Sequence, residues 1–256
     1  MELIDTHAHI FLDQFVEDID LVIHQAKKAS IGRIYMPNID VDSIENMINI
    51  EDMYPGYCYS MIGLHPCSVN QKFENQINVI DDWLSTRRFA GIGETGTDLY
   101  WDKTFFNQQI ESLEIHISWA KEHRLPIILH SRESLDETIS IIEKNHDDRL
   151  KGIFHCFTGN KDQAERIIAI DFLLGIGGVL TFKNTDLDKI INELPLTNIV
   201  LETDSPYLAP MPYRGKRNEP KYIPFIASKL AGIFGITVNE VAKITSENAK
   251  KAFENR

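Results

Sequence analysis

The first apolar run of the chain ends in Leu3-Ile4-Asp5-Thr6-His7-Ala8-His9, and this stretch decides how the rest of the sequence is interpreted. Side chains two residues apart on an extended segment point to the same side, so His7 and His9 leave the end of one strand together. Two imidazoles at this spacing can bind one metal ion. If they do, further histidine and carboxylate ligands should end other strands. If they are only surface histidines, the remaining histidines should follow no order.

Short apolar, β-branched runs alternate with longer amphipathic segments along the chain. The expected strands are Leu3–Asp5, Arg33–Met36, Cys58–Ile62, Ala90–Gly93, Ile127–Leu129, Gly152–Phe154, Phe172–Ile176 and Ile199–Glu202. Spacings of three and four between apolar residues predict helices, including stripes of Val16, Ile19, Val22, Ile23, Ala26 and Ala29 and of Ile110, Leu113, Ile117 and Ala120. Eight strand-helix units in 256 residues favour a closed (β/α)8 TIM barrel, with a doubly wound open sheet as the main alternative.

We expect a single domain over residues 1–256. The long irregular stretch from Ala209 to Pro220 is interpreted as a loop. An extra C-terminal helix is expected after Thr237, because Thr237-Val238-Asn239-Glu240 has the spacing of a capping box.

Potential ligands stand where the expected strands end. They are His7, His9, His65, Glu94, His130, His155 and Asp204. In a barrel these strand ends converge on one mouth, where the active sites of such barrels form. The expected metal ligands are His7, His9, Glu94, His130, His155 and Asp204. The four remaining histidines are interpreted as surface residues; they are His24, His116, His123 and His146.

Four imidazoles and two carboxylates are too many for one tetrahedral catalytic zinc with an open position, so two divalent ions are expected. His7, His9 and Asp204 would hold one ion, His130 and His155 the other, and Glu94 would bridge them. Imidazole-rich ligation favours zinc, manganese, iron or nickel over magnesium, and the sequence does not choose among them. Bound water would become hydroxide near neutral pH, with Asp204 taking or delivering the proton.

The composition excludes several other classes. A formal charge of −12 argues against a protein that coats nucleic acid with a general basic surface. Three unclustered cysteines suggest neither a disulfide framework nor a four-cysteine zinc site. The N-terminus lacks the features of a signal peptide, and no apolar stretch approaches the ~18 residues of a membrane span. We therefore expect a cytoplasmic protein, with no obligate protein partner and no membrane.

Six motifs, taken together and in order, resemble the TatD family of metal-dependent deoxyribonucleases. They are Asp5-Thr6-His7-Ala8-His9, Gly63-Leu64-His65-Pro66, Gly93-Glu94-Thr95-Gly96-Thr97-Asp98, Leu129-His130-Ser131-Arg132, Phe154-His155-Cys156-Phe157-Thr158-Gly159 and Leu201-Glu202-Thr203-Asp204-Ser205-Pro206-Tyr207. The resemblance implies a barrel of the amidohydrolase-like group that hydrolyses DNA phosphodiester bonds, often from an end. It implies the same six metal ligands and places His65 near the substrate phosphate.

The stretch Arg214-Gly215-Lys216-Arg217-Asn218-Glu219-Pro220 resembles the family's basic loop. Arg214, Lys216 and Arg217 are therefore expected to bind the substrate phosphates, because arginine can hold a phosphate with two hydrogen bonds. Tyr100 and Trp101 either stack on a base or, as the simpler interpretation, pack the barrel top.

The sequence departs from the family pattern at three positions. Thr95 and Thr97 stand where aliphatic residues are usual, and Leu99 stands where a tyrosine is usual. These replacements would add hydroxyls near the metals or alter the packing.

Two other functions are open. The first is an amidohydrolase-type C–N or lactone hydrolase, although Glu94 stands where many such enzymes carry a carboxylated lysine. The second is a non-catalytic metal or nucleic-acid binding module. The expected partner is DNA or another phosphodiester.

Overall fold

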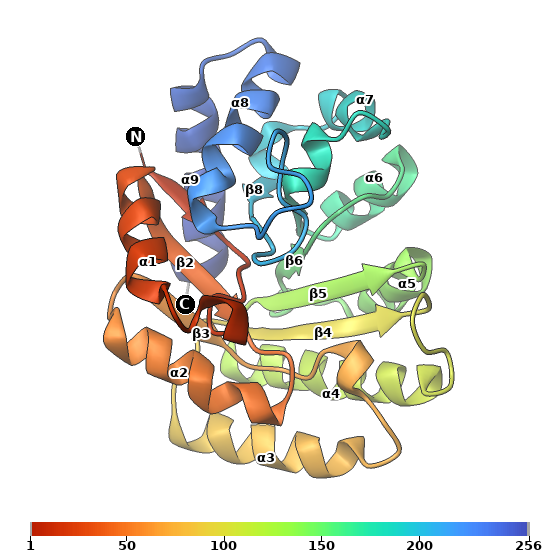
Figure 1. Cartoon of the computed structure of the whole chain (residues 1–256). Helices are drawn as coiled ribbons and strands as arrows, with labels where there is room; N and C mark the ends of the chain where they lie inside the picture. The colour runs from red at the N-terminus through yellow and green to blue at the C-terminus, as the bar shows by residue number, and fades with distance from the viewer. Residues whose placement is uncertain (1, 255–256) are drawn as a thin grey trace.

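The chain folds as a closed barrel of parallel strands surrounded by helices (Figure 1). The computed structural model describes residues 2–254 and contains eight strands within this range. They are β1 Leu3–Asp5, β2 Ile31–Pro37, β3 Cys58–Met61, β4 Ile92–Asp98, β5 Ile127–Arg132, β6 Gly152–Phe154, β7 Leu173–Ile176 and β8 Ile199–Leu201. Neighbours pair in the orders β1-β2-β3 and β4-β5-β6-β7-β8. Backbone bridges Ile62–Ile92 and Ala8–Ser205 join these two groups at both seams, which confirms the predicted (β/α)8 barrel.

Helices follow the strands and cover the outside of the barrel. They are α1 Ile19–Lys28, α2 Ile44–Met53, α3 Phe73–Thr86, α4 Phe106–His123, α5 Leu135–Asn145, α6 Lys161–Ala169, α7 Leu187–Asn192, α8 Ile223–Phe234 and α9 Val238–Glu254. The predicted stripe on α4 is buried at Leu113, Ile117 and Ala120. The stripe predicted for α1 is wrong at its start: Val16 is 68% exposed, because it lies in the turn before the helix begins at Ile19.

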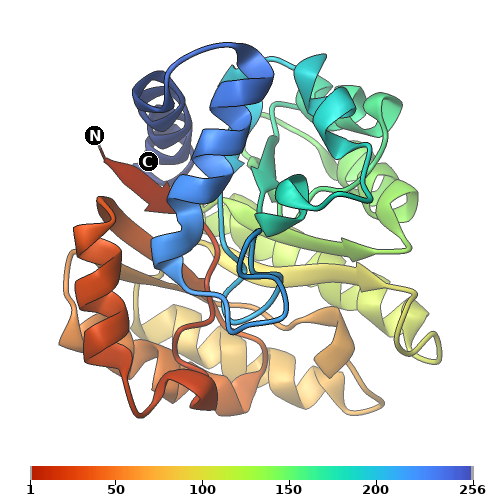
Figure 2. The same ribbon diagram turned by 45° about the horizontal axis from the view of Figure 1, so that its top comes forward.

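The extra C-terminal helix, α9, packs against residues that line the barrel. The ring of Phe253 stacks on Tyr35 of β2 with the ring centroids 3.7 Å apart. The predicted capping box is present, since the Thr237 N–H donates to Glu240 Oε2 over 2.8 Å and the Glu240 N–H donates to Thr237 Oγ1 over 3.2 Å. Figure 2 shows α9 beside α8, next to β1 at the start of the chain.

Strand β4 extends further than its sequence indicates. The strand was expected to end at Gly93, with Glu94 just beyond it, yet β4 continues to Asp98 and Glu94 lies within the strand. The extension pairs in parallel with β5, with Asp98 opposite Arg132. Gly96 permits this pairing, since its φ is +144° and a Cβ there would lie 2.0 Å from the His130 carbonyl oxygen. As a result, Glu94 and Asp98 both lie beside His130.

The stretch from Ala209 to Pro220 is a loop after β8, as predicted, and ends in a 3₁₀ turn at Pro220–Tyr222. Within the described residues, no single helix has the length and apolar character needed to cross a membrane. Only the bent pair Pro220–Phe234 and Val238–Glu254, with 108° between its halves, passes such a test of length and composition.

Candidate metal centre

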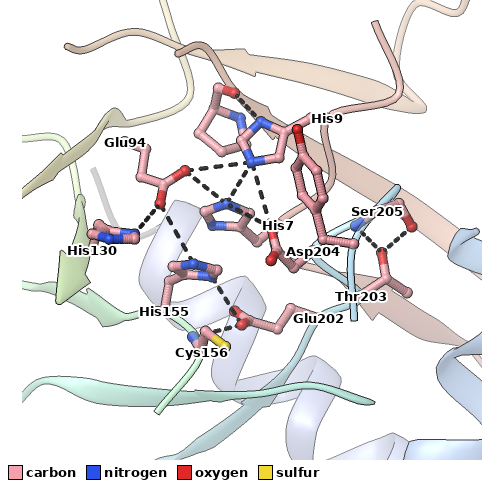
Figure 3. A network of polar contacts seen from close by, with 12 residues as sticks. His7, His9, Glu94, His130, His155, Cys156, Glu202, Thr203, Asp204 and Ser205 are labelled. Atoms are coloured by element: carbon pink, nitrogen blue, oxygen red, sulfur yellow. Dashed lines mark hydrogen bonds and ion pairs between the residues drawn. The ribbon is translucent and has the colours of Figure 1, made fainter. Parts of the chain in front are cut away.

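The first group of donor atoms brings together residues that follow β1 and β8 with a carboxylate of β4 at the mouth of the barrel (Figure 3). The Nε2 atoms of His7 and His9 lie 3.1 Å apart and 3.1 and 3.4 Å from Glu94 Oε2. Asp204 Oδ1 lies 3.8 Å from the His7 nitrogen and 3.5 Å from the His9 nitrogen. Two imidazoles and two carboxylates therefore converge on one point.

The second group of donors faces the other oxygen of Glu94. Glu94 Oε1 lies 3.0 Å from His130 Nδ1 and 3.5 Å from both His65 Nε2 and His155 Nε2. The His155 ring also stacks on His7 with centroids 3.7 Å apart, so His155 lies between the two groups. Glu94 thus presents one oxygen to each group. His65, which was expected to contact only the substrate phosphate, lies 3.5 Å from this shared carboxylate.

Backbone hydrogen bonds hold the ends of β1 and β8 together. The Asp204 N–H donates to the His7 carbonyl over 2.9 Å, and the His9 N–H donates to the Ser205 carbonyl over 2.7 Å. The buried Asp5 carboxylate accepts from the N–H of Thr203 over 3.0 Å. Asp204 has φ +58°, a left-handed conformation that non-glycine residues seldom adopt. The chain turns at this residue, and its carboxylate faces the two histidines.

In three of the histidines, the ring nitrogen that faces away from the cluster has its own partner, whereas Nδ1 of His7 is buried without one among the described residues. His9 Nδ1 lies 3.0 Å from the Pro37 carbonyl, His130 Nε2 lies 2.9 Å from Asp98 Oδ2, and His155 Nδ1 lies 3.0 Å from Glu202 Oε1. Such contacts set the tautomer and orientation of a metal-binding imidazole. Neither Asp98 nor Glu202 was predicted from the sequence to take part in the site, although both lie within the TatD motifs.

The carboxylates and imidazoles of the cluster shift one another's pKa values. Burial raises the pKa of Glu94, but the surrounding histidines, His7 foremost, outweigh burial and hold that pKa well below its usual range. Burial also raises the pKa of Asp204, and the hydrogen bond from His9 contributes most to lowering it below its ordinary value. Burial lowers the pKa of His9, while Asp204 and Glu94 raise it to about 9. Both carboxylates are therefore ionised at neutral pH and attract cations.

The donor atoms fit divalent metal ions. Bonds of about 2.0–2.2 Å to nitrogen and oxygen place neighbouring ligand atoms about 3.0–3.5 Å apart around one ion. The distances within the two groups, 3.0 to 3.8 Å, are close to this range. A mixed imidazole and carboxylate donor set suits zinc and manganese.

A cavity of about 470 Å³ lies over the cluster. Its walls include Arg132 and two exposed aromatic side chains, Trp101 with 68% and Tyr207 with 47% of its surface exposed. The exposure of Trp101 contradicts the interpretation that it packs the barrel top. Sequence reasoning also missed Arg132, although its place two residues after His130 on β5 gives the two side chains the same direction.

The basic loop does not line this cavity. Among the described residues that form the cavity wall, none comes from Arg214, Lys216 or Arg217. The Arg217 guanidinium holds Asp18 with two hydrogen bonds of 2.9 and 2.6 Å and lies 3.2 Å from Glu219. Contact of the loop with substrate stays a prediction.

The structure corrects the expectation for His116 and decides between the two alternatives for Thr97. His116 was expected on the surface, yet it is fully buried on α4, where Nε2 accepts the Leu64 N–H over 3.0 Å and Nδ1 donates to the Ser112 carbonyl. A helix next to a barrel presents one face inward, and His116 lies on that face. Thr97 directs its hydroxyl to Ser134, 2.8 Å away, so this departure from the family pattern alters packing against α5.

Comparisons with known proteins identify the family of the chain. The family model described as "TatD related DNase" matches residues 4–254. The metal-dependent hydrolase YabD of Bacillus subtilis (strain 168) is 36% identical over 252 residues, 98% of each chain. The "3'-5' ssDNA/RNA exonuclease TatD" of Yersinia pseudotuberculosis serotype O:3 (strain YPIII) is 29% identical and covers 98% of this chain and 99% of its own.

The crystal structure of YJJV, a TatD homologue from Escherichia coli K12, superposes with a TM-score of 0.92 at 27% identity, over 98% of this chain and 97% of that one. The match of the family model to nearly the whole chain and the 36% identity to YabD leave one conclusion. The chain belongs to the TatD family and is a metal-dependent hydrolase.

Proposed function

We propose that the protein is a nuclease that uses two divalent metal ions to hydrolyse the terminal phosphodiester bonds of single-stranded DNA or RNA. One observation carries the proposal: the two oxygens of Glu94 face two separate groups of imidazoles. A bridging carboxylate between two ions is a common feature of enzymes that act on phosphodiesters. The name of the Yersinia relative supplies the substrate class.

The two groups divide the ligands. As the order of the strands predicts, His7, His9 and Asp204 would hold the first ion and His130 and His155 the second, with Glu94 between them. In the structure, His155 also groups with His7 and Asp204, and His65 groups with Glu94 and His130. Zinc, manganese, iron and nickel suit such donors. When bound, such ions lower the pKa of water and neutralise charge on the phosphoryl oxygens.

Side chains of the protein would accept the proton, orient the metal ligands and contact the substrate. The ionised Asp204 carboxylate is 14% exposed, so it is open to the cavity and would take a proton from the attacking water. Asp98 and Glu202 hold the rings of His130 and His155 in place. His65 lies at the cavity wall and would contact the phosphate of the substrate.

The charge of the protein suits this function. With a net charge of −12, the surface as a whole does not attract a polyanion, so affinity for nucleic acid has to come from the mouth of the barrel. A cavity of about 470 Å³ suits a terminal nucleotide rather than a duplex.

The test is digestion of end-labelled single-stranded DNA, duplex DNA and RNA by protein loaded with manganese or zinc. Asp204→Asn should slow cleavage by about 10²–10⁴-fold, the contribution typical of a general base. His130→Ala should lower both activity and the metal content measured by mass spectrometry. His24→Ala is the matched control, because His24 is exposed on α1.

Three outcomes would contradict the proposal. If both site variants keep full activity, the site is wrong. If the protein turns over lactones or cyclic amides but no phosphodiester, it is an amidohydrolase-type enzyme instead. Binding of metal and DNA without any turnover would support the non-catalytic alternative.

A further inference from the structure

Arg132 combines positive charge, exposure and a fixed position at the mouth of the barrel. It is the last residue of β5, two residues beyond His130. Its guanidinium lies 3.6 Å from the ring centroid of Tyr100 and 5.4 Å from that of Trp101. Among residues 2–254, no carboxylate oxygen lies within 4.0 Å of it. The charge of Arg132 is therefore not neutralised by an ion pair, and the stacking holds it in place.

The arginine of the basic loop differs in this respect. Arg217 is bound to Asp18 and Glu219, so its hydrogen-bonding edge is already occupied. Arginine presents a planar edge of N–H donors that matches a phosphate, and that edge is free in Arg132. In a protein with a net charge of −12, a cation of this kind beside the candidate metal centre points to an anionic ligand.

The cavities around Arg132 indicate where that ligand lies. Arg132 lines the cavity of about 470 Å³ over the metal centre and an adjoining one of about 260 Å³. It also lines a third cavity of about 540 Å³, where Glu133, Asp136 and Glu137 repel a polyanion. The carboxylates of the first cavity, Glu94, Asp98 and Asp204, belong instead to the candidate metal centre, where bound cations would offset their charge. The side toward Trp101 has the exposed indole instead, a surface on which any base can stack.

We propose that Arg132 and Trp101 form a binding site for the nucleotide next to the scissile bond. Arg132 binds the phosphate of that nucleotide, and Trp101 stacks on its base. The site accepts a single strand of any sequence, because its two residues contact the phosphate and the face of the base. Neither residue contacts a base edge. This inference rests on the proposed nuclease function and adds the position of the strand beyond the reacting phosphate.

The first experiment measures binding of a fluorescent oligothymidylate, by anisotropy at several salt concentrations with manganese present. The starting protein is Asp204→Asn, in which turnover should be too slow to degrade the probe. Adding Arg132→Gln should weaken binding about tenfold. It should also make the negative slope of log K against log salt less steep by about 0.7, the value for one phosphate contact on a single strand.

The matched control is Arg88→Gln, because Arg88 is exposed and follows α3, away from the strand ends that form the mouth. It removes the same charge and should leave affinity and slope unchanged. Adding Trp101→Ala in place of Arg132→Gln should weaken binding about tenfold with no change of slope, because stacking involves no counterion release. An Arg132→Gln slope equal to that of the control would overturn the proposal, as would absence of salt-dependent binding by the starting protein.

The second experiment compares two substrates in the otherwise unchanged enzyme. Thymidine 5'-(p-nitrophenyl phosphate) has one phosphate, whereas an oligothymidylate also has the neighbouring one. Arg132→Gln should lower the ratio of kcat/KM for the oligonucleotide to that for the small diester at least tenfold. An equal loss on both substrates would overturn the assignment, because Arg132 would then act on the scissile phosphate or on the fold. If the enzyme cleaves neither substrate, the nuclease function fails, and the binding experiment still decides the role of Arg132.

Discussion

The hydrogen bond between Asp98 and His130 offers the sharpest test of the metal centre. Asp98 Oδ2 lies 2.9 Å from His130 Nε2, and Asp98 Oδ1 accepts the N–H groups of Tyr100 and Trp101 over 2.9 Å each. In Asp98→Asn the amide oxygen keeps these two backbone donors, so the new NH2 group has to face His130. It then donates to Nε2, which favours the tautomer with the proton on Nδ1.

That proton lies on the nitrogen that faces Glu94 Oε1, 3.0 Å away, and it occupies the lone pair that would bind metal. A hydrogen bond to a charged group contributes about 1.5–3 kcal/mol. At 1.4 kcal/mol per factor of ten, loss of this bond should weaken metal binding about 10- to 100-fold. Mutations of groups that orient metal ligands have effects of the same size.

The assay is a titration of metal against a competing chelator, with the melting temperature of each variant recorded beside it. Asp102→Asn is the matched control, since Asp102 is exposed in the loop after β4 and accepts the Thr104 N–H. An Asp98→Asn protein that melts like the wild type and binds metal within twofold of it would refute the reasoning. Partial recovery of activity at high metal concentration is the expected companion result.

Three further predictions concern stability. Metal at a hundredfold excess over its Kd should stabilise the protein by about 2.7 kcal/mol, or roughly 5–10 °C in Tm for a chain of this size, and an equal shift in His7→Ala would contradict the site. Burial lowers the pKa of His116 to about 4, so the unfolded chain takes up its proton first as the pH falls below 6.5. Urea titrations should therefore show the stability of the wild type, relative to His116→Gln, falling by about 2 kcal/mol between pH 7.5 and pH 5; parallel curves would exclude this. Arg217→Ala and Asp18→Ala should each cost roughly 1 kcal/mol, and the double variant should cost little more than either; fully additive losses would show that the pair does not interact.

The alternation of strands and helices could be predicted from sequence because it depends on local periodicity. The extent of β4 could not. The segment Gly93-Glu94-Thr95-Gly96-Thr97-Asp98 has two glycines, two acidic residues and no apolar residue, so only its two threonines favour a strand. It is extended because β5 supplies its hydrogen-bonding partners, and that pairing exists only in the folded barrel.

The contacts of single side chains could not be predicted from the sequence for the same reason, because they exist only in the folded barrel. Arg132 and Arg217 have the same chemistry in the sequence, yet Arg217 pairs with Asp18, 199 residues away, while Arg132 has no carboxylate partner among residues 2–254. His116 shows a related limit, since helical spacing does not reveal that its ring reaches the backbone of Leu64.

The sequence by itself determined the kind of chemistry: histidines and carboxylates at the ends of successive strands, in the order of the TatD motifs. These features depend on residue type and local periodicity, which a linear chain displays directly. The tertiary structure alone decided that the two oxygens of Glu94 face different imidazoles and that Asp98 and Glu202 orient two of these rings. It also decided that Arg132 lines the same cavity, without a carboxylate partner in the described part of the chain. These relations arise only when the barrel closes and brings together residues as distant as Asp5 and Thr203, 198 positions apart.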